Sequence, residues 1–366
     1  MHVYAFSKAR AALSLSFGAG ICLAAFMFIM ILAPFIINIS ERQGYELFAR
    51  GMSYIGYLWM GGLLLFTTSS LILDMYRLLV YAGAFIFKKN LAVMILPAGF
   101  SFFVSLLLSV AISFYGYSEA KNIRSEHLIV TTSKLPDNTS KLRIVQISDV
   151  HLGLIVREER LKNIIRIVQE AKPDIVVSTG DLVDGQINKL EGLAEMLQGV
   201  KPKYGKFAVT GNHEFYAGLG QALSFTRKAG FKMLRGEGVN VEGVINIGGV
   251  DDQTLYSAGL ARNISDKELL AELDHREFTL FLKHRPIVEN DSMGLFDLQL
   301  SGHTHKGQIF PFSIVTKMFF RHQAGKFNLP HKSILYVSRG TGTWGPPIRF
   351  LSPPEVTVVD LVNQKD

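Results

Sequence analysis

Carboxylate, imidazole and amide side chains recur directly after short apolar segments in the part of the 366-residue chain beyond residue 140. The first examples are Asp149 and His151, which follow the apolar run 142–147. Alternate residues of an extended chain point to the same side, so these two side chains can bind one ion. The comparable groups further along the chain are Asp181, Asn212, His213, His284, His303 and His305. Together these residues predict a metal centre.

The residue types restrict which metals this centre suits. Nitrogen and oxygen ligands without sulfur favour Mn, Fe, Zn, Ni or Co over copper(I) or an iron–sulfur cluster. The single cysteine, Cys22, lies in an apolar run, which excludes a disulfide within the chain and a cysteine-based zinc site. Eight candidate groups are too many for one ion, whereas two ions roughly 3.5–4 Å apart, bridged by a carboxylate and a hydroxide, would use them all.

The segments before these residues predict how they are positioned. A helix is expected over 157–171, with Leu161, Ile164 and Val168 on one face and Pro173 beyond its end. Strand, helix and strand in succession indicate an α/β sheet, in which ligands bind at the carboxyl edge. We therefore expect an α/β sandwich of two sheets flanked by helices. Its predicted strands are 142–147, 175–179, 206–210, 244–250, 278–283, 298–301, 335–338 and 356–361.

The first third of the chain is apolar enough to lie in a membrane. Hydrophobic residues make up 48% of the sequence, and the runs 11–39, 53–73 and 91–117 each reach the roughly 20 residues that cross a bilayer. The run 78–87 is too short to span and would lengthen a neighbour. We predict a transmembrane anchor of about three helices over 1–120, a linker over 121–141 and a catalytic domain over 142–366.

The positive charges predict an orientation. With three spans, Lys8 and Arg10 lie on the same side as Arg77, Lys88 and Lys89, which favours a cytoplasmic N-terminus and a catalytic domain on the other side. A fourth span would reverse this. The net charge of +7 is spread along the chain, so a membrane surface or an anionic substrate accounts for it, and we expect no nucleic-acid partner.

Five motifs in order resemble those of the calcineurin-like metallophosphoesterase family over about residues 142–361. The order and spacing of all five match, and a membrane-attached bacterial branch of the family is the nearest likeness, with its SDxHLG motif and a Gly-Thr-Gly stretch like 339–345. The resemblance thus implies a location in the bacterial cytoplasmic membrane. The motifs are Asp149-Val150-His151, Gly180-Asp181-Leu182-Val183-Asp184, Gly211-Asn212-His213-Glu214, His284 and Gly302-His303-Thr304-His305.

The same resemblance implies a role for each motif residue. Two divalent ions would be bound, and a hydroxide that bridges them would attack the phosphate ester. Asn212 and His213 would contact the substrate phosphate, His213 would protonate the leaving oxygen, and Asp184 would support the site by hydrogen bonding. Asp149, His151 and His305 would hold the first ion; Asn212, His284 and His303 would hold the second; Asp181 would bridge them.

The substrate class is less closely defined. Protein phosphatases of this family carry Arg-Gly after the second Asp of GDxxD, whereas Gly185 and Gln186 stand here. The sequence therefore favours phosphodiesters or pyrophosphate-linked substrates, lipids among them, over phosphoproteins. Alternatives are a phosphomonoesterase with a soluble substrate and a non-catalytic membrane module that binds a phosphorylated ligand. The segment 310–327 is either a loop packed into the core or an amphipathic element at the bilayer surface.

Overall fold

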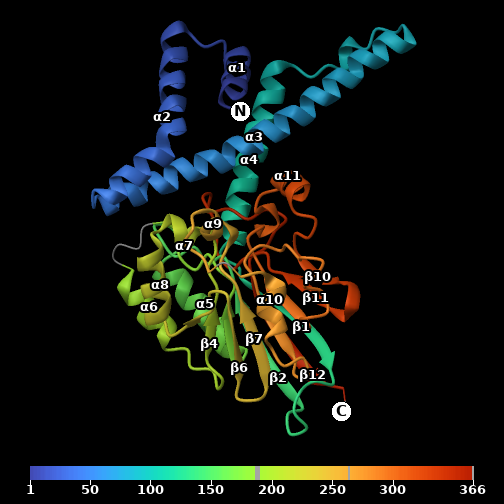
Figure 1. The fold of residues 1–366 in the computed structure, drawn as a ribbon. Coiled ribbons are helices and arrows are strands. Elements are labelled where there is room, and N and C mark those ends of the chain that lie inside the picture. The colour runs from blue at the N-terminus through green and yellow to red at the C-terminus, as the bar shows by residue number, and fades with distance from the viewer. Residues whose placement is uncertain (186–189, 263, 365–366) are drawn as a thin grey trace. The chain divides into compact units, whose positions relative to one another are not determined.

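The computed structural model describes the whole chain except residues 186–189, 263 and 365–366. The chain divides into two compact units. The first comprises Met1–Ser118 together with Gly345–Phe350, and the second comprises Glu119–Trp344 and the residues from Leu351 onward. Long helices make up most of the first unit, and the second carries the strands (Figure 1).

The first unit contains the three apolar helices that the sequence predicts. Its segments are α1 (His2–Leu13), α2 (Phe17–Arg42), α3 (Glu46–Phe87), a 3₁₀ turn η1 (Ala92–Met94) and α4 (Ala98–Glu119). By length and composition α2, α3 and the segment 92–119 can each cross a membrane. The 42 residues of α3 extend about 63 Å, twice the hydrocarbon thickness of a bilayer of about 30 Å.

The helix boundaries differ from the predicted spans. The run 11–39 is divided, because Ser14 adopts a left-handed conformation and the Ser16 side chain caps α2 by accepting a hydrogen bond from the Ala19 N–H. The run 78–87 is the continuation of α3. The run 91–117 becomes α-helical only at Ala98, after a proline that disfavours helix in the residue before it.

The second unit is built on two six-stranded sheets, as predicted. In the first sheet β2 to β5 are parallel, and in the second β7, β8, β9 and β11 are parallel. The first sheet has the order β1 (Arg124–Thr132), β12 (Glu355–Asn363), β2 (Lys141–Ile147), β3 (Ile175–Ser178), β4 (Lys206–Ala208), β5 (Lys232–Met233). The second has the order β10 (Gly325–Asn328), β11 (Ile334–Val337), β9 (Leu298–Ser301), β8 (Thr279–Leu282), β7 (Ile245–Gly249), β6 (Glu237–Val241).

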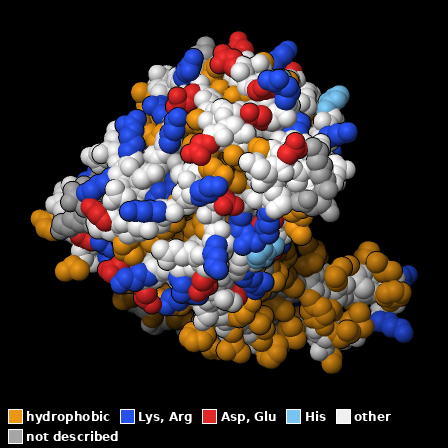
Figure 2. Space-filling view, turned by 90° about the horizontal axis from the view of Figure 1, so that it is seen from below, with side chains coloured by type: hydrophobic (Ala, Val, Ile, Leu, Met, Phe, Trp, Pro, Cys, Tyr) orange, Lys and Arg blue, Asp and Glu red, His pale blue; other side chains and the backbone are white. Residues whose placement is uncertain are grey.

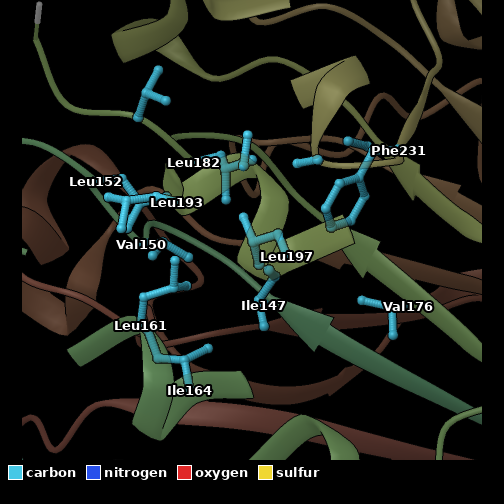
Figure 3. Close-up of a cluster of buried hydrophobic side chains, with 14 of the residues drawn as sticks. Ile147, Val150, Leu152, Leu161, Ile164, Val176, Leu182, Leu193, Leu197 and Phe231 are labelled. Carbon is cyan, nitrogen blue, oxygen red and sulfur yellow. The ribbon is translucent and has the colours of Figure 1, made fainter. Parts of the chain in front are cut away.

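The strand residues alternate between two hydrophobic cores. Along β3, Val176 packs with the helices that cover the first sheet, whereas Ile175 and Val177 pack between the two sheets. Figure 3 shows the helix-side core, in which Leu161 and Leu197 lie close to Ile147. The helices of this unit are α5 (Glu158–Glu170), α6 (Glu191–Gln198), α7 (Asn212–Tyr216), α8 (Leu219–Lys228), α9 (Gln253–Ser257), α10 (Asp266–Ala271) and α11 (Phe312–Phe319).

Within the predicted linker 121–141, residues Arg124–Thr132 form the strand β1. This strand pairs in parallel with β12 along its whole length, from Arg124 opposite Glu355 to Thr132 opposite Asn363. Alternate residues such as Leu128 and Val130 are buried, as in an edge strand with one covered face, so the apolar and β-branched run 128–132 carried a strand signal that the linker prediction overlooked. The partner strand lies at the other end of the chain.

Charged side chains are dispersed over the second unit. In Figure 2, Lys and Arg lie among Asp and Glu across the face in view. Exposed pairs such as Lys162–Glu158 (2.6 Å) and Lys228–Glu195 (2.8 Å) contribute little to stability, because water and salt screen the charges. The two buried cores therefore supply most of the stabilisation.

Candidate metal centre

All the predicted site residues lie in the segments that follow strands of the two sheets, within six residues of a strand end. Because the strands that carry them are parallel within each sheet, their carboxyl ends meet at one edge. Backbone bonds continue past the strands and hold the loops together, with the Asp149 N–H donating to Gly180 O and the His151 N–H to Asp181 O, both at 3.0 Å. The site residues follow β2 (Asp149, His151), β3 (Asp181), β4 (Asn212, His213), β8 (His284) and β9 (His303, His305).

One group of candidate ligands consists of Asp149, His151 and His305, and all three are buried. His305 Nε2 lies 3.1 Å from His151 Nε2 and 3.5 Å from Asp149 Oδ1. One ligand atom from each residue lies within 4.8 Å of the others. The spacing fits a single ion bound by two imidazoles and a carboxylate.

A second group consists of Asp181, His284 and His303. His284 Nε2 lies 3.3 Å from Asp181 Oδ2 and 3.1 Å from His303 Nδ1. The same Asp181 Oδ2 lies 3.8 Å from Nε2 of His151, a residue of the first group. The Asp181 carboxylate therefore lies between the two groups, as a bridging ligand would.

Two further observations indicate that these residues suit a bound cation. The Oδ1 atom of Asn212 is buried without a hydrogen-bond partner, and such an unsatisfied acceptor costs about 1–3 kcal/mol unless a ligand compensates. Five candidate ligands also have a left-handed backbone, which is strained for residues other than glycine and concentrates at functional sites. These are Asp149 (φ 53°), His151 (55°), Asp181 (51°), His303 (72°) and His305 (48°).

Asp184 lies close to the Nδ1 atoms of two imidazoles, those of His151 and His213. Its Oδ1 lies 3.0 Å from His213 Nδ1 and 3.3 Å from His151 Nδ1, and its carbonyl oxygen lies 2.9 Å from His213 Nδ1. A proton on His213 Nδ1 would be donated to Asp184, which leaves Nε2 of His213 for a ligand. The His213 side chain is only 12% exposed.

The electrostatics of these groups are dominated by burial and by mutual pairing. Burial lowers the pKa of His213, but the carboxylates of Asp181 and Asp184 outweigh it and raise this pKa to about 9. Burial likewise lowers the pKa of His284, and Asp181 again outweighs it, giving about 10. Burial and the neighbouring His284 charge lower the pKa of His303 to about 3. A cation bound at His284 would displace the proton that this imidazole holds, because only the neutral ring can be a ligand.

Glu214 is a residue whose importance the sequence did not reveal. Its buried carboxylate accepts three backbone hydrogen bonds, from the N–H groups of Asp181 (3.0 Å), Leu182 (2.8 Å) and Gly211 (2.6 Å). It thereby ties the loop after β3 to the loop after β4. The signal that could have found it is its place three residues after Gly211, where a glutamate caps a helix.

Glycines and the Gly-Thr-Gly stretch shape the loop that carries Asp149. The Gly342 N–H donates to Asp149 O at 3.0 Å, and a Cβ on Gly342 would lie 2.0 Å from Val150 O. A Cβ on Gly302 would lie 2.1 Å from Asp149 Oδ2. These positions accept only glycine, because the backbone and the carboxylate approach too closely for any side chain.

Comparison with known proteins places the same residues in a family context. The sequence profile of the calcineurin-like phosphoesterase family matches residues 142–307, which include every site residue from Asp149 to His305. A metallophosphoesterase of Aquifex aeolicus is 41% identical over 258 residues, which cover 70% of this chain and 98% of the relative.

Two further relatives match over less than two thirds of their own length. A metallophosphoesterase of Campylobacter jejuni is 35% identical over 239 residues, covering 63% of this chain and 62% of the relative. A Danio rerio transmembrane protein with a metallophosphoesterase domain is 30% identical over 272 residues, covering 70% and 62%. Identity, profile and clustered ligand residues agree, and the chain therefore belongs to the calcineurin-like metallophosphoesterases, which are metal-dependent phosphoester hydrolases.

Proposed function

We propose that this protein is a membrane-anchored phosphodiesterase that works with two divalent ions, drawn from Mn, Fe, Zn and Ni. The observation that carries the proposal is the position of Asp181 Oδ2, which lies 3.3 Å from His284 Nε2 and 3.8 Å from His151 Nε2. These imidazoles belong to the two separate ligand groups, so one carboxylate can serve an ion in each. A single-ion centre would leave one group without a role.

The proposed ligands follow the two groups. When bound, the ions would neutralise charge on the phosphoryl oxygens and lower the pKa of the water that attacks phosphorus. The buried Asn212 Oδ1 supplies a neutral ligand and leaves its amide nitrogen for the substrate. Asp149, His151 and His305 would hold the first ion; Asn212, His284 and His303 would hold the second; Asp181 would serve both.

His213 is the proposed proton donor to the leaving oxygen. The hydrogen bonds of its Nδ1 with Asp184 fix the ring and its tautomer, so Nε2 faces the reaction. Asn212 and His213 together contact the phosphate. General acid catalysis of this kind contributes typically about 10²–10⁴-fold to the rate.

A diester is the favoured substrate because it carries less negative charge than a phosphate monoester. Gly185 stands where phosphoprotein phosphatases of this family carry an arginine, so this position supplies no cation for the phosphate. Residues 1–120 would anchor the enzyme in a bacterial cytoplasmic membrane. Residues 142–366, with β1, would form the catalytic domain on the extracytoplasmic side. A soluble monoester substrate, or binding without catalysis, remains the alternative.

The test uses the purified full chain in detergent with Mn²⁺, assayed on bis-p-nitrophenyl phosphate and on p-nitrophenyl phosphate. We expect faster turnover of the diester, and losses of about 10²-fold or more in Asp181→Asn and His213→Ala. Matched controls are Asp360→Asn in β12 and His275→Ala, an exposed histidine outside the motifs, and both should retain wild-type rates.

Other results would replace the proposal by a named alternative. Turnover of the monoester alone would establish the phosphomonoesterase. Bound Mn²⁺ without turnover of either ester would favour the binding module. Cleavage of single-stranded DNA, tested in parallel, would contradict the expectation that nucleic acid is not a partner.

A further inference from the structure

The helix α11 exposes its apolar residues instead of burying them. None of its eight residues is buried, and the side chains of Ile314, Met318 and Phe319 are 58%, 79% and 77% exposed. The interpretation of this segment as a loop packed into the core is therefore wrong for 312–319. Exposed apolar clusters of this kind mark surfaces that are covered by a partner or a membrane.

Close packing attaches α11 to the loop of the last histidine motif. A Cβ on Gly307, whose φ is +74°, would lie 2.3 Å from the Ser313 backbone, so this contact requires glycine. The Gln323 side-chain amide donates to Ser313 O at 2.7 Å, and the Gln323 backbone carbonyl accepts from Thr304 Oγ1 at 2.5 Å. Phe320, directly after α11, packs edge-on against the His303 ring at 5.1 Å.

Two exposed aromatic side chains lie beside the proposed proton donor. The rings of Tyr216 and Trp344 are centred 5.3 and 6.4 Å from the His213 ring, and these residues are 57% and 51% exposed. Gln308 holds Trp344 by accepting from its backbone N–H (2.9 Å) and donating to its carbonyl (2.8 Å). Tyr and Trp favour the interface between lipid headgroups and acyl chains, because they combine an apolar ring with a polar group.

The charge of this region matches an anionic surface. The sequence contains no Asp or Glu between Asp297 and Glu355. Lys317, Arg321 and Lys326 are exposed in α11 or shortly after it. An apolar helix face flanked by cations is the composition of elements that lie in the interface of anionic membranes.

We infer that α11 inserts its apolar face into the headgroup region of an anionic bilayer, and that the enzyme takes phosphodiesters of amphiphiles held in that bilayer. We favour a membrane over a soluble partner because the catalytic domain follows closely on a segment that can cross a bilayer. That segment ends with α4 at Glu119, and β1 begins five positions later at Arg124. The catalytic domain is therefore covalently tethered, through a short connection, to a segment that can cross a membrane. The substrate class rests on the proposed function, whereas the insertion does not.

Insertion is tested without any catalytic readout. Cys22, the single cysteine, is changed to Ser, and Phe319→Cys is labelled with an environment-sensitive fluorophore in nanodiscs of phosphatidylcholine and phosphatidylglycerol. We expect quenching by lipids that carry a spin label near the headgroup, and weaker quenching in phosphatidylcholine alone. The matched control is Ile129→Cys on β1, an apolar side chain that is 65% exposed and should not be quenched. Equal quenching at the two positions would overturn the insertion.

The substrate class is tested with Met318→Asp/Phe319→Asp in the full chain. Turnover of phosphatidylglycerol in vesicles should fall about tenfold or more, while turnover of bis-p-nitrophenyl phosphate changes less than about twofold. Ile129→Asp should change neither rate. Equal losses on both esters, or no loss on the lipid, would overturn the substrate class. A wild-type enzyme inactive on bis-p-nitrophenyl phosphate would contradict the proposed function instead, and the quenching result would be unaffected.

Discussion

The buried carboxylate of Glu214 connects two loops of the site through their backbone amides. It accepts from the N–H groups of Asp181, Leu182 and Gly211, which lie in two loops from neighbouring strands. Both loops carry candidate ligands. In a buried environment such charge-assisted bonds are strong, and they hold Asp181 and Asn212 in position before any ion binds.

Glu214→Gln should weaken ion binding without touching a ligand. One carboxylate oxygen becomes an NH₂ group, so at least one backbone N–H loses its acceptor and faces another donor. We expect the free energy of unfolding to fall by about 1–3 kcal/mol and Mn²⁺ affinity to fall about 10–100-fold. Calorimetric titration with Mn²⁺ measures the affinity.

The matched control for this change is Glu268→Gln. Glu268 accepts from the Ser265 N–H at 2.9 Å in the cap of α10, so it has a similar structural role away from the site. The Glu268→Gln change should lower the free energy of unfolding slightly and leave Mn²⁺ affinity unchanged. Wild-type affinity in Glu214→Gln would show that the loops hold their ligands without this carboxylate.

At the scale of elements, the pair β2–β12 joins the start of the catalytic fold to its end. Arg143 and Asp360 are directly opposite in this antiparallel pair. Arg143 Nε donates to Asp360 Oδ1 at 2.7 Å, and Arg143 Nη2 donates to Asp360 Oδ2 at 3.1 Å. Lys141 Nζ lies 2.8 Å from Asp360 Oδ2. These residues are at the beginning of β2, whereas Asp149 follows its other end, so the ion pairs stabilise the sheet without contributing to the site.

Asp360→Asn should destabilise the fold in a pH-dependent manner. Burial raises the pKa of Asp360, but Arg143 and Lys141 outweigh it and lower this pKa below its ordinary value. The stabilisation is therefore present above pH about 4 and is lost as the pH falls through the lowered pKa. At pH 7 we expect the variant to be less stable by about 1–2 kcal/mol, with a smaller difference at pH 3.

Urea unfolding of the metal-free full chain in detergent, followed by circular dichroism, compares the variant with wild type at both pH values. Metal-free protein keeps the loss of bound ions at low pH from contributing to the comparison. A difference in stability that is the same at pH 7 and pH 3 would show that the carboxylate charge is not its source.

At the scale of the whole catalytic unit, each ligand group draws on both sheets. The first combines Asp149 and His151, which follow β2, with His305, which follows β9 of the other sheet. The second combines Asp181, which follows β3, with His284 and His303. An ion bound in either group would therefore cross-link the two sheets, in addition to their apolar packing and to hydrogen bonds such as Gln146 Nε2 to Ser301 O (3.0 Å).

Removal of the ions should consequently destabilise the whole unit. A ligand present at 100 times its dissociation constant stabilises the native state by about 2.7 kcal/mol per site. We expect chelation by EDTA to lower the midpoint of thermal unfolding and added Mn²⁺ to restore it, as followed by circular dichroism. His305→Ala should lose part of this Mn²⁺-dependent shift, and His275→Ala should keep all of it. An unfolding midpoint that does not respond to Mn²⁺ would contradict ion binding in the folded state.

From residue types and spacing alone, the fold class could be predicted, together with a set of Asp, Asn and His side chains expected at one edge of the sheet. Apolar runs that end in Asp, Asn or His are local signals in the sequence. Parallel strands bring such ends to one edge of the sheet, and this does not depend on the length of the loops between them. The three apolar helices are equally local, because length and hydropathy of adjacent residues define them. The family resemblance rests on the same short motifs.

The contacts between distant segments could not be predicted from local sequence. The strand β1 pairs with β12, more than 200 residues away, and its own alternation of buried and exposed residues does not indicate that partner. Contacts between loops likewise place Asp181 Oδ2 between two ligand groups. They also bring the Glu214 carboxylate within hydrogen-bonding distance of three backbone N–H groups. The exposure of α11 depends on which face the rest of the fold leaves uncovered. Burial and pairing are properties of contacts between segments, whereas periodicity and residue type are properties of neighbours in the chain.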